Sequence, residues 1–187
     1  VLPSAGIAVA DTENNASVIV KGNLRSEGDT NVSAHAINEV EAEAGVSTIE
    51  NESGEAGSLV NAAVTVAKIR NAAKVELNGG TTAVSGGELN AAAMAQNSVA
   101  TTAVAETDKD ALASTAVNVT DASSSADLII GGKVTADKLN FTADNTISNE
   151  IQAATQVGQS RFQTKSNLSG GALNAILGNV NSQKAKT

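Results

Sequence analysis

The stretch GIAVADTENNASVIV at residues 6–20 decides the fold, because it recurs along the chain without a gap. The second copy is AVTVAKIRNAAKVEL at residues 63–77, and the third is AVNVTDASSSADLII at residues 116–130. The offsets between copies are 57 (63 − 6) and 53 (116 − 63) residues. A fourth copy begins near Ala175 and reaches the last residue. Self-similarity of this kind indicates a repeat architecture.

Within each copy, apolar side chains occupy alternate positions, which is the pattern of a β-strand. The residues predicted to face inward are Ala16, Val18 and Val20, then Ala73, Val75 and Leu77, then Ala126, Leu128 and Ile130. A second short strand is predicted upstream at Ile7/Val9, Val64/Val66 and Val117/Val119, with a polar link such as residues 13–15 between the two strands.

Turns and a third strand complete each unit. Gly22 and the glycine pairs at 79–80 and 131–132 follow the second strand and predict turns. The third strand is predicted at residues 31–34, 89–92 and 139–142. Glycine punctuation between short strands is typical of an all-β fold.

Stacking such units predicts an all-β parallel β-helix (β-solenoid) of about three 53–57-residue units plus a partial fourth. With coils of roughly 20–28 residues, two or three coils per unit would make seven to nine coils and a rod about 35–45 Å long. Residues 1–187 would then be a single segment of a longer array, because no capping segment is visible. A helical or mixed fold is the alternative, since residues 91–105 are rich in alanine.

The composition excludes several classes of function. Aromatic residues make up 1% of the chain, which suits a narrow interior of alanine and valine. No cysteine is present, so disulfides, zinc knuckles and thiol nucleophiles are excluded. The net charge of −8 argues against a nucleic-acid partner, and no apolar run is long enough for membrane insertion.

The string ASVIVKGNL at residues 16–24, followed by NVSA at residues 31–34, resembles the shaft of filamentous-haemagglutinin-type exoproteins. Within these it is most similar to the leukotoxin-like filamentous adhesins of anaerobic bacteria. The resemblance covers about residues 6–160. It implies a right-handed parallel β-helix in a very large secreted or surface-attached protein, with no family catalytic residue to carry over. Trimeric autotransporter heads are a second resemblance, ranked lower because their repeats are much shorter.

Acidic residues are the first candidates for chemistry. Glu39, Glu41 and Glu43 alternate with apolar residues, so a strand would present them as one outer row. Such a row could attract a cation such as calcium, but it is read here as a solvated face. Three more acids follow in the sequence: Glu50, Glu52 and Glu55.

The single histidine, His35, could in principle pair with Glu39 as an acid and base. It is read instead as a surface or turn histidine, because a triad would also need a serine nucleophile and no nucleophile-elbow sequence appears. No catalytic, cofactor-binding or metal-binding residue is therefore assigned, and no cofactor is expected.

Asparagines recur in the same places of each unit: Asn14 with Asn71, and Asn38 with Asn97 and Asn149. They predict either stacked amide ladders or turns. Asn-x-Ser/Thr triplets begin at Asn15, Asn31, Asn51, Asn118, Asn140 and Asn167, where chance occurrence competes with glycan attachment. Basic residues gather near the end of the chain and are read as solvated surface: Arg161, Lys165, Lys184 and Lys186. Ile19 and Ile129 fall on the outward phase as a contact patch or as isolated apolar residues.

These observations predict a non-enzymatic structural or adhesive rod segment of a secreted or cell-surface protein. The expected partners are a host-cell surface, a matrix protein or a glycan, and the open coil ends predict self-association. The shaft of a secreted leukotoxin-like cytotoxin is one alternative. A carbohydrate-active or carbohydrate-binding β-helix is another, disfavoured because the chain has no Tyr or Trp on which sugars could stack.

Overall fold

The computed structural model describes residues 3–47, 60–107, 113–157, 160–164 and 179–186. In these ranges every regular element is a β-strand. The strands are β1 (Ser4–Lys21), β2 (Leu24–Glu27), β3 (Thr30–Ser47), β4 (Val60–Ser85), β5 (Glu88–Thr107), β6 (Ala113–Thr135), β7 (Lys138–Val157), β8 (Ser160–Thr164) and β9 (Asn179–Lys186).

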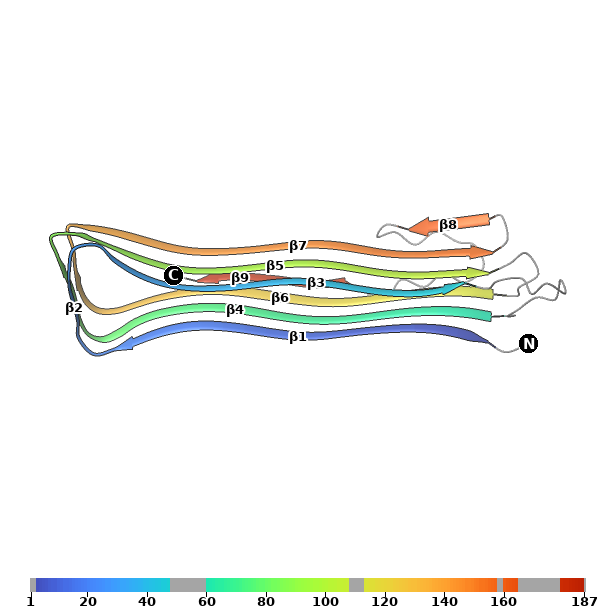
Figure 1. Cartoon of the computed structure of the whole chain (residues 1–187), viewed down its shortest axis with the longest axis horizontal. Coiled ribbons are helices and arrows are strands. Elements are labelled where there is room, and N and C mark those ends of the chain that lie inside the picture. The colour runs from blue at the N-terminus through green and yellow to red at the C-terminus, as the bar shows by residue number, and fades with distance from the viewer. Residues whose placement is uncertain (1–2, 48–59, 108–112, 158–159, 165–178, 187) are drawn as a thin grey trace.

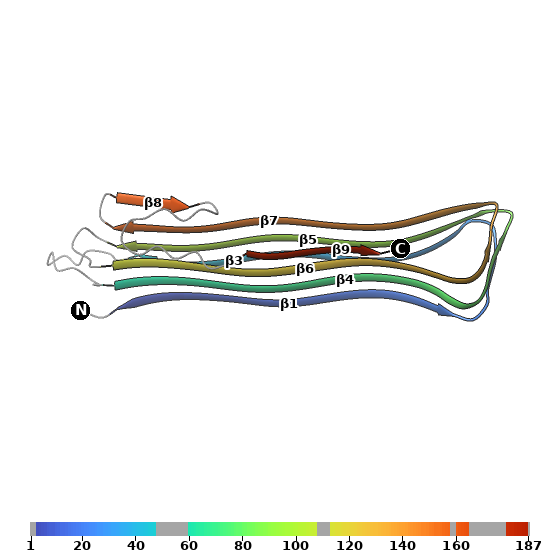
Figure 2. The ribbon, with the colours of Figure 1, turned by 180° about the vertical axis from the view of Figure 1, so that it is seen from behind.

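The strands form two facing sheets (Figures 1 and 2). The first sheet has the order β1-β4-β6-β9, with β2 also paired to β4, and the second has the order β3-β5-β7-β8. All neighbours are parallel except β7 and β8. The chain therefore runs out along the first sheet, turns, and returns along the second. The prediction of an all-β parallel β-solenoid is confirmed.

The register of the first sheet reproduces the sequence repeat. Gly6 lies opposite Ala63, and Ala63 lies opposite Ala116, so the strand offsets are the 57 and 53 residues of the aligned copies. β9 then pairs with residues 120–127 of β6, which confirms the partial fourth unit. Copies of one pattern stack in register because like side chains then meet at the same height on the same face.

The predicted number of coils is wrong. Each unit forms one coil, because β1 is a single strand of 18 residues and the expected polar link at residues 13–15 lies inside it. The described residues therefore form three coils and part of a fourth, rather than seven to nine coils. The 18 residues of β1 span about 60 Å, whereas three stacked strands span only about 10 Å. The longest dimension runs along the strands (Figure 1), not along the stack.

The predicted inward positions form the core. Val75 and Leu128 are 0% and 1% exposed, and both pack in the main apolar cluster. Val18 packs against the same cluster but is half-buried, because β1 is the outermost strand. Ile130 is a partial exception: it lies opposite buried Leu77 but is 36% exposed. The reason is that β9 covers β6 only as far as Asp127.

Amide side chains link the two sheets across the interior. Asn71 is buried, and its Nδ2 donates to the carbonyl oxygens of Ala36 (2.8 Å) and Gln96 (2.9 Å) on the opposite sheet. Asn14 and Asn38 also donate to opposite-sheet carbonyls. Asn14 lies beside Asn71 and Asn38 beside Asn97, as the repeats predict. These amides bind across the interior, however, so the predicted stacked ladder at these positions is wrong.

The sequence comparison aligned Asn149 of the third coil with Asn97, but the structure places Asn149 two residues further along the strand. Asn97 lies opposite Ile147, whereas Asn149 lies opposite Val99. A shift of two residues keeps every side chain on the same face, so alternation alone does not detect it.

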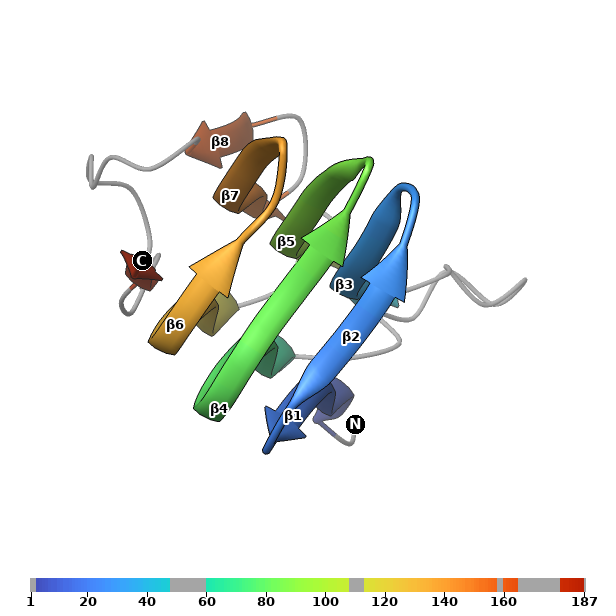
Figure 3. The same ribbon diagram turned by 90° about the vertical axis from the view of Figure 1, so that its left-hand side faces the viewer.

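The turn end of the solenoid is built by glycine. Gly22, Gly79 and Gly132 have positive φ, as do Gly28 and Gly86, a conformation that other residues rarely adopt. The turns stack on one another: Asn23 Oδ1 accepts from the backbone N–H of Thr81, and Asp29 Oδ1 accepts from that of Glu88. Figure 3 shows this end, where β2 lies beside the last part of β4.

Candidate functional site

An apolar patch covers part of the outer face of the first sheet. We call it the aliphatic ladder, and it consists of two rows of β-branched residues in register, namely Ile7, Val64 and Val117, and Val9, Val66 and Val119. Ile7 and Val9 are each 71% exposed. β-branched residues are favoured in strands, and their outward phase here leaves Val66 exposed as well, whereas Val64, Val117 and Val119 are half-buried. Apolar residues that gather on an outer face are candidates for an interaction site.

The sequence predicted these strands but not the ladder. The signal was present, because Ile7, Val9 and Ile19 are separated by even numbers of residues in one uninterrupted strand. Ile19, predicted to face outward, is 47% exposed. If the alternation at Ile19 is extended toward the N-terminus through residues 13–15, it places Ile7 and Val9 on the outer face as well. The assumed break at those residues hid this relation.

Charged rows follow the ladder on the same face. Asp11 lies opposite Lys68, which lies opposite Asp121, and Glu13 lies opposite Arg70. Opposite charges on neighbouring strands stabilise a sheet, whereas like charges destabilise it. The first coil is thus acidic where the second is basic.

One ion pair on β4 changes the acidity of a glutamate side chain. Lys74 Nζ lies 2.5 Å from Glu76 Oε2, and Asn78 Nδ2 donates to Glu76 Oε1 at 3.1 Å. The hydrogen bond from Lys74, followed by that from Asn78, lowers the pKa of Glu76 below its ordinary value. Both donors stabilise the ionised carboxylate.

The predicted acidic row is present on β3. Glu39, Glu41 and Glu43 are all exposed and alternate along the strand, so neighbouring members stand roughly 6.5–7 Å apart. A calcium ion binds oxygens at about 2.3–2.6 Å, and the row does not converge on one point. Within the ranges described, no group of three or more His, Cys, Asp or Glu side chains is placed to hold a metal ion. Glu50, Glu52 and Glu55 lie outside the described residues.

The structure does not bring His35 and Glu39 together. Both are exposed on the outer face of β3, four residues apart. That separation corresponds to roughly 13 Å along a strand, and an acid–base pair needs hydrogen-bond distance. His35 is therefore a surface histidine, in agreement with the interpretation preferred from the sequence.

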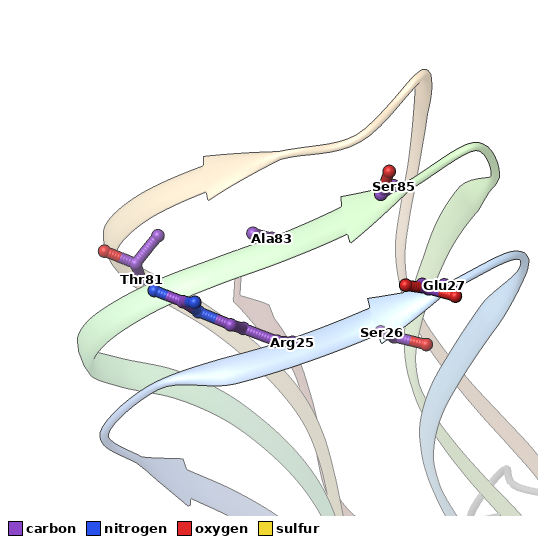
Figure 4. Close-up of a pocket in the computed structure, with 6 residues that line it drawn as sticks. All are labelled: Arg25, Ser26, Glu27, Thr81, Ala83 and Ser85. Atoms are coloured by element: carbon purple, nitrogen blue, oxygen red, sulfur yellow. The ribbon is translucent and has the colours of Figure 1, made fainter.

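Open grooves lie on the outer surface of the described residues, and two of them border charged side chains. One has a volume of about 430 Å³ and lies over β2 and the end of β4 (Figure 4). Its charged residues are Arg25 and Glu27, each presented singly among small side chains. The other, of about 260 Å³, crosses the middle of the first sheet beside Glu13 and Arg70.

A stacked amide ladder exists at positions other than those predicted. Asn90 Nδ2 donates to Asn31 Oδ1 at 2.9 Å, and Asn140 Nδ2 donates to Asn90 Oδ1 at 2.6 Å. The three residues are equivalent positions of β3, β5 and β7. In the sequence, these three asparagines lie at the first or second position of the predicted third strand of each unit. This shared position was the signal for the ladder.

The candidate glycan acceptors differ in accessibility. Asn118 is fully buried, and its amide donates to Thr101 O and Gln152 O across the interior. It is therefore unavailable for modification in the folded chain. Asn15 and Asn31 are exposed and Asn140 is half-buried, whereas Asn51 and Asn167 lie outside the described residues.

The remaining predicted surface residues lie near the end of the stack. Arg161 belongs to β8, and Lys184 and Lys186 belong to β9, whereas Lys165 lies outside the described residues. Ile129 is half-buried on the outward phase of β6. In the strand order of the two sheets, β8 and β9 lie at the opposite end from β1 and β3, and β3 carries the acidic row.

Comparison with protein-family models, with curated proteins and with solved structures gives no match. The described ranges contain no helix long and apolar enough to cross a membrane. The features that remain for function are the aliphatic ladder and the charged rows.

Proposed function

We propose that the chain is a structural and adhesive rod segment of a large secreted or surface-attached bacterial exoprotein, and that it is not an enzyme. The observation that carries this proposal is the aliphatic ladder, which repeats β-branched residues at one height on three successive coils. A surface repeated along a stack offers a partner an extended lateral contact. The resemblance of residues 16–34 to filamentous-haemagglutinin-type shafts supports the same function.

The mechanical part of the proposal rests on the interior. Long strands pair in register on both sheets, and inward amides such as Asn71 and Asn118 bind each sheet to the other. These bonds resist sliding of one sheet over the other, because each amide meets a specific carbonyl. A segment of this kind holds a binding surface at a fixed distance and orientation.

The test is binding of the purified chain to host cells, extracellular-matrix proteins and glycans. We expect binding that falls at least several-fold in the double variant Ile7→Ser, Val9→Ser. The matched control is Ile19→Ser with Ile37→Ser, two exposed isoleucines outside the ladder (47% and 59% exposed), which should leave binding unchanged. Absence of binding by the parent chain, or equal loss in both variants, would contradict an adhesive ladder.

Two activity assays address the alternatives. Lysis of host cells by the chain would favour the cytotoxin shaft over the adhesive rod. Hydrolysis of a polysaccharide that is lost in Glu39→Gln or Glu41→Gln would favour a carbohydrate-active β-helix. We expect neither activity.

A further inference from the structure

The dipeptide Asn78-Gly79 lies in β4 at the turn end of the solenoid, where the register of that strand is interrupted. Toward β6, residues 78 and 79 together oppose Gly131, because the register shifts at this point. In the registers of β4 with its described neighbours β1, β2 and β6, no residue is paired with Gly79. Two residues opposite one form a β-bulge, which disrupts the ladder locally. The backbone at Gly79 is therefore held less firmly than the strand on either side of it.

The surroundings of this dipeptide are open. Asn78 and Gly79 are both exposed, Gly79 has a φ of 87°, and a Cβ built on Gly79 would meet no atom within 4 Å. The amide of Asn78 lies against Gly131, where a Cβ would come within 2.9 Å of Asn78 Oδ1. Glycine has no side chain to crowd its own nitrogen or to restrict rotation of the peptide group. The Asn78 amide and the Gly79 nitrogen can therefore approach each other without displacing packed atoms.

No other asparagine of the chain combines these features. Asn78 is the one asparagine in the sequence that is followed by glycine. Asn97 and Asn118 are completely buried, and their amides are bonded to the opposite sheet. Asn23 is exposed at the same end of the solenoid, but it is followed by leucine, whose side chain crowds the neighbouring nitrogen. The structure thus singles out one amide for reaction with its own backbone.

We propose that Asn78 deamidates spontaneously through a cyclic imide with Gly79, so that this turn is a modification site that needs only water. The Gly79 nitrogen attacks Cγ of Asn78 and loses its proton to the solvent as the N–Cγ bond forms. The Cγ–Nδ2 bond then breaks, and the departing nitrogen takes up a proton from the solvent and leaves as ammonia. Water adds to one of the two imide carbonyls and breaks one ring C–N bond, which gives aspartate or isoaspartate. Because the reacting groups belong to adjacent residues, their freedom to align governs the rate.

Either product changes the contacts of this turn. Asn78 Nδ2 donates to Glu76 Oε1 at 3.1 Å, and Asn78 O accepts from the Gly22 N–H at 3.4 Å. Aspartate removes the donor and places a second carboxylate beside Glu76, so the pKa of Glu76 rises. Isoaspartate also lengthens the backbone by one carbon and converts the main-chain carbonyl into a free carboxylate, which displaces the contact with Gly22. The modification does not depend on the proposed adhesive function, because the aliphatic ladder lies toward the other end of β4.

Ageing of the purified full chain at mildly alkaline pH tests the proposal, with peptide mapping by mass spectrometry as the measurement. We expect a mass gain of about 1 Da at Asn78. Its rate should be at least about tenfold that at the exposed asparagines without a following glycine, which are Asn15, Asn23 and Asn31. In water enriched with oxygen-18, the product should carry heavy oxygen, as hydrolysis of the imide requires. The rate in the folded chain should lie within several-fold of the rate in denaturant.

Two variants separate the chemistry from its structural effect. Asn78→Gln keeps the amide but would need a larger ring to cyclise, so it should not convert at this position. Asn78→Asp reproduces one product, and NMR titration should give Glu76 a higher pKa than in the parent chain. The aged chain, which also contains isoaspartate, should show faster hydrogen exchange at Gly22 and in residues 78–82 than Asn78→Asp does. Exchange in the distant residues 61–67 of β4 should be the same in both samples.

Three outcomes would overturn the proposal. If Asn78 converts in denaturant but stays intact in the folded chain, the turn protects the amide instead of exposing it. Conversion at similar rates at Asn15, Asn23 and Asn31 would show that the bulge and its glycine do not select the site. Hydrogen exchange at Gly22 that is unchanged by ageing, despite complete conversion of Asn78, would show that the modification leaves the turn intact.

Discussion

At the scale of single residues, the interior combines aliphatic side chains with amides. Val75, Leu77 and Leu128 are almost completely buried, and burying such a side chain contributes about 1.5–3 kcal/mol. Asn71, Asn97 and Asn118 are buried among them with amide nitrogens bonded to the opposite sheet. Alanines between these residues leave room for the amides to reach across.

We expect Leu128→Asp to unfold the coils around it. The change buries an unpaired charge, at a cost of several kcal/mol, which is a large part of the stability of an ordinary domain. Thermal melting followed by circular dichroism should show loss of the cooperative transition. Glu41→Ala, at an exposed position, should change the free energy of unfolding by less than about 0.5 kcal/mol. A similar melt for both variants would contradict the burial of Leu128 in the main apolar cluster.

We expect Asn71→Ala to destabilise the chain by about 2 kcal/mol, because it removes two hydrogen bonds between the sheets. Denaturant unfolding measures the change. The control is Asn15→Ala, at an exposed neighbouring position whose amide bonds only to Glu13, and it should be nearly neutral. Equal effects of the two variants would show that the cross-sheet amides contribute nothing.

Glu76 should titrate below the ordinary glutamate range, because Lys74 and Asn78 donate to its carboxylate. A lowered pKa in the folded state gives stability above the unfolded pKa that is lost as pH falls through the folded pKa. NMR titration of the carboxyl carbon measures it. Lys74→Gln should move the pKa back toward the ordinary value, whereas Lys133→Gln, at an exposed distant position, should not.

At the scale of elements, the turn regions decide how the strands of the second sheet align. The first sheet keeps the sequence offsets of 57 and 53, whereas Thr30 pairs with Leu89 and Leu89 pairs with Leu139. The turns therefore differ in length between coils, and the register shift between Leu77 and Gly80 lies in this region. Each turn rests on the backbone of the previous one, for example through Gly28 N–H donating to Ser85 O.

Gly87→Ala should destabilise the chain by about 1–3 kcal/mol, because a Cβ there would overlap the backbone of Gly28 and Asp29. Gly45→Ala is the matched control: a Cβ there meets open space in an extended strand. Because alanine loses less conformational freedom on folding, that variant should be unchanged or slightly more stable. Chemical denaturation of both variants measures the difference. Equal stability of the two would show that the turns do not pack closely.

At the scale of the whole molecule, we expect stability to be greatest in the middle coil. β4 and β5 have neighbours on both sides, whereas β1 and β3 are outermost in their sheets. Stacked repeats derive much of their stability from contacts with adjacent repeats. A coil with two neighbours therefore opens less readily than a coil with one.

Hydrogen exchange should follow this order. We expect the slowest exchange in β4 and β5 and faster exchange in β1, because half of the β1 amides face the side on which none of the described strands pairs with it. Mass spectrometry or NMR of the isolated chain measures the rates for each strand. Uniform protection, or slower exchange in β1 than in β4, would indicate that the edge is paired in solution.

Much of the fold followed from the sequence by local rules. Alternation identified the strands and their inward faces, as at Val75 and Leu128, and glycine marked the turns. The repeat also predicted the register of the first sheet, because Gly6, Ala63 and Ala116 are equivalent in the aligned copies and also lie opposite one another on β1, β4 and β6. The surface position of His35 was predicted as well, and the side chain is exposed on β3.

The coil size, the aliphatic ladder and the destination of the amides were decided only by the tertiary structure. Polar residues 13–15 look like a link in the sequence, but Asn14 finds a carbonyl acceptor on the opposite sheet and the strand continues. The strand position of Asn149 depended on the lengths of the turns. Alternation could not reveal it, because a slip of two residues leaves every side chain on the same face of the sheet. Alternation determines which way a side chain points, and only packing between sheets determines what it meets there.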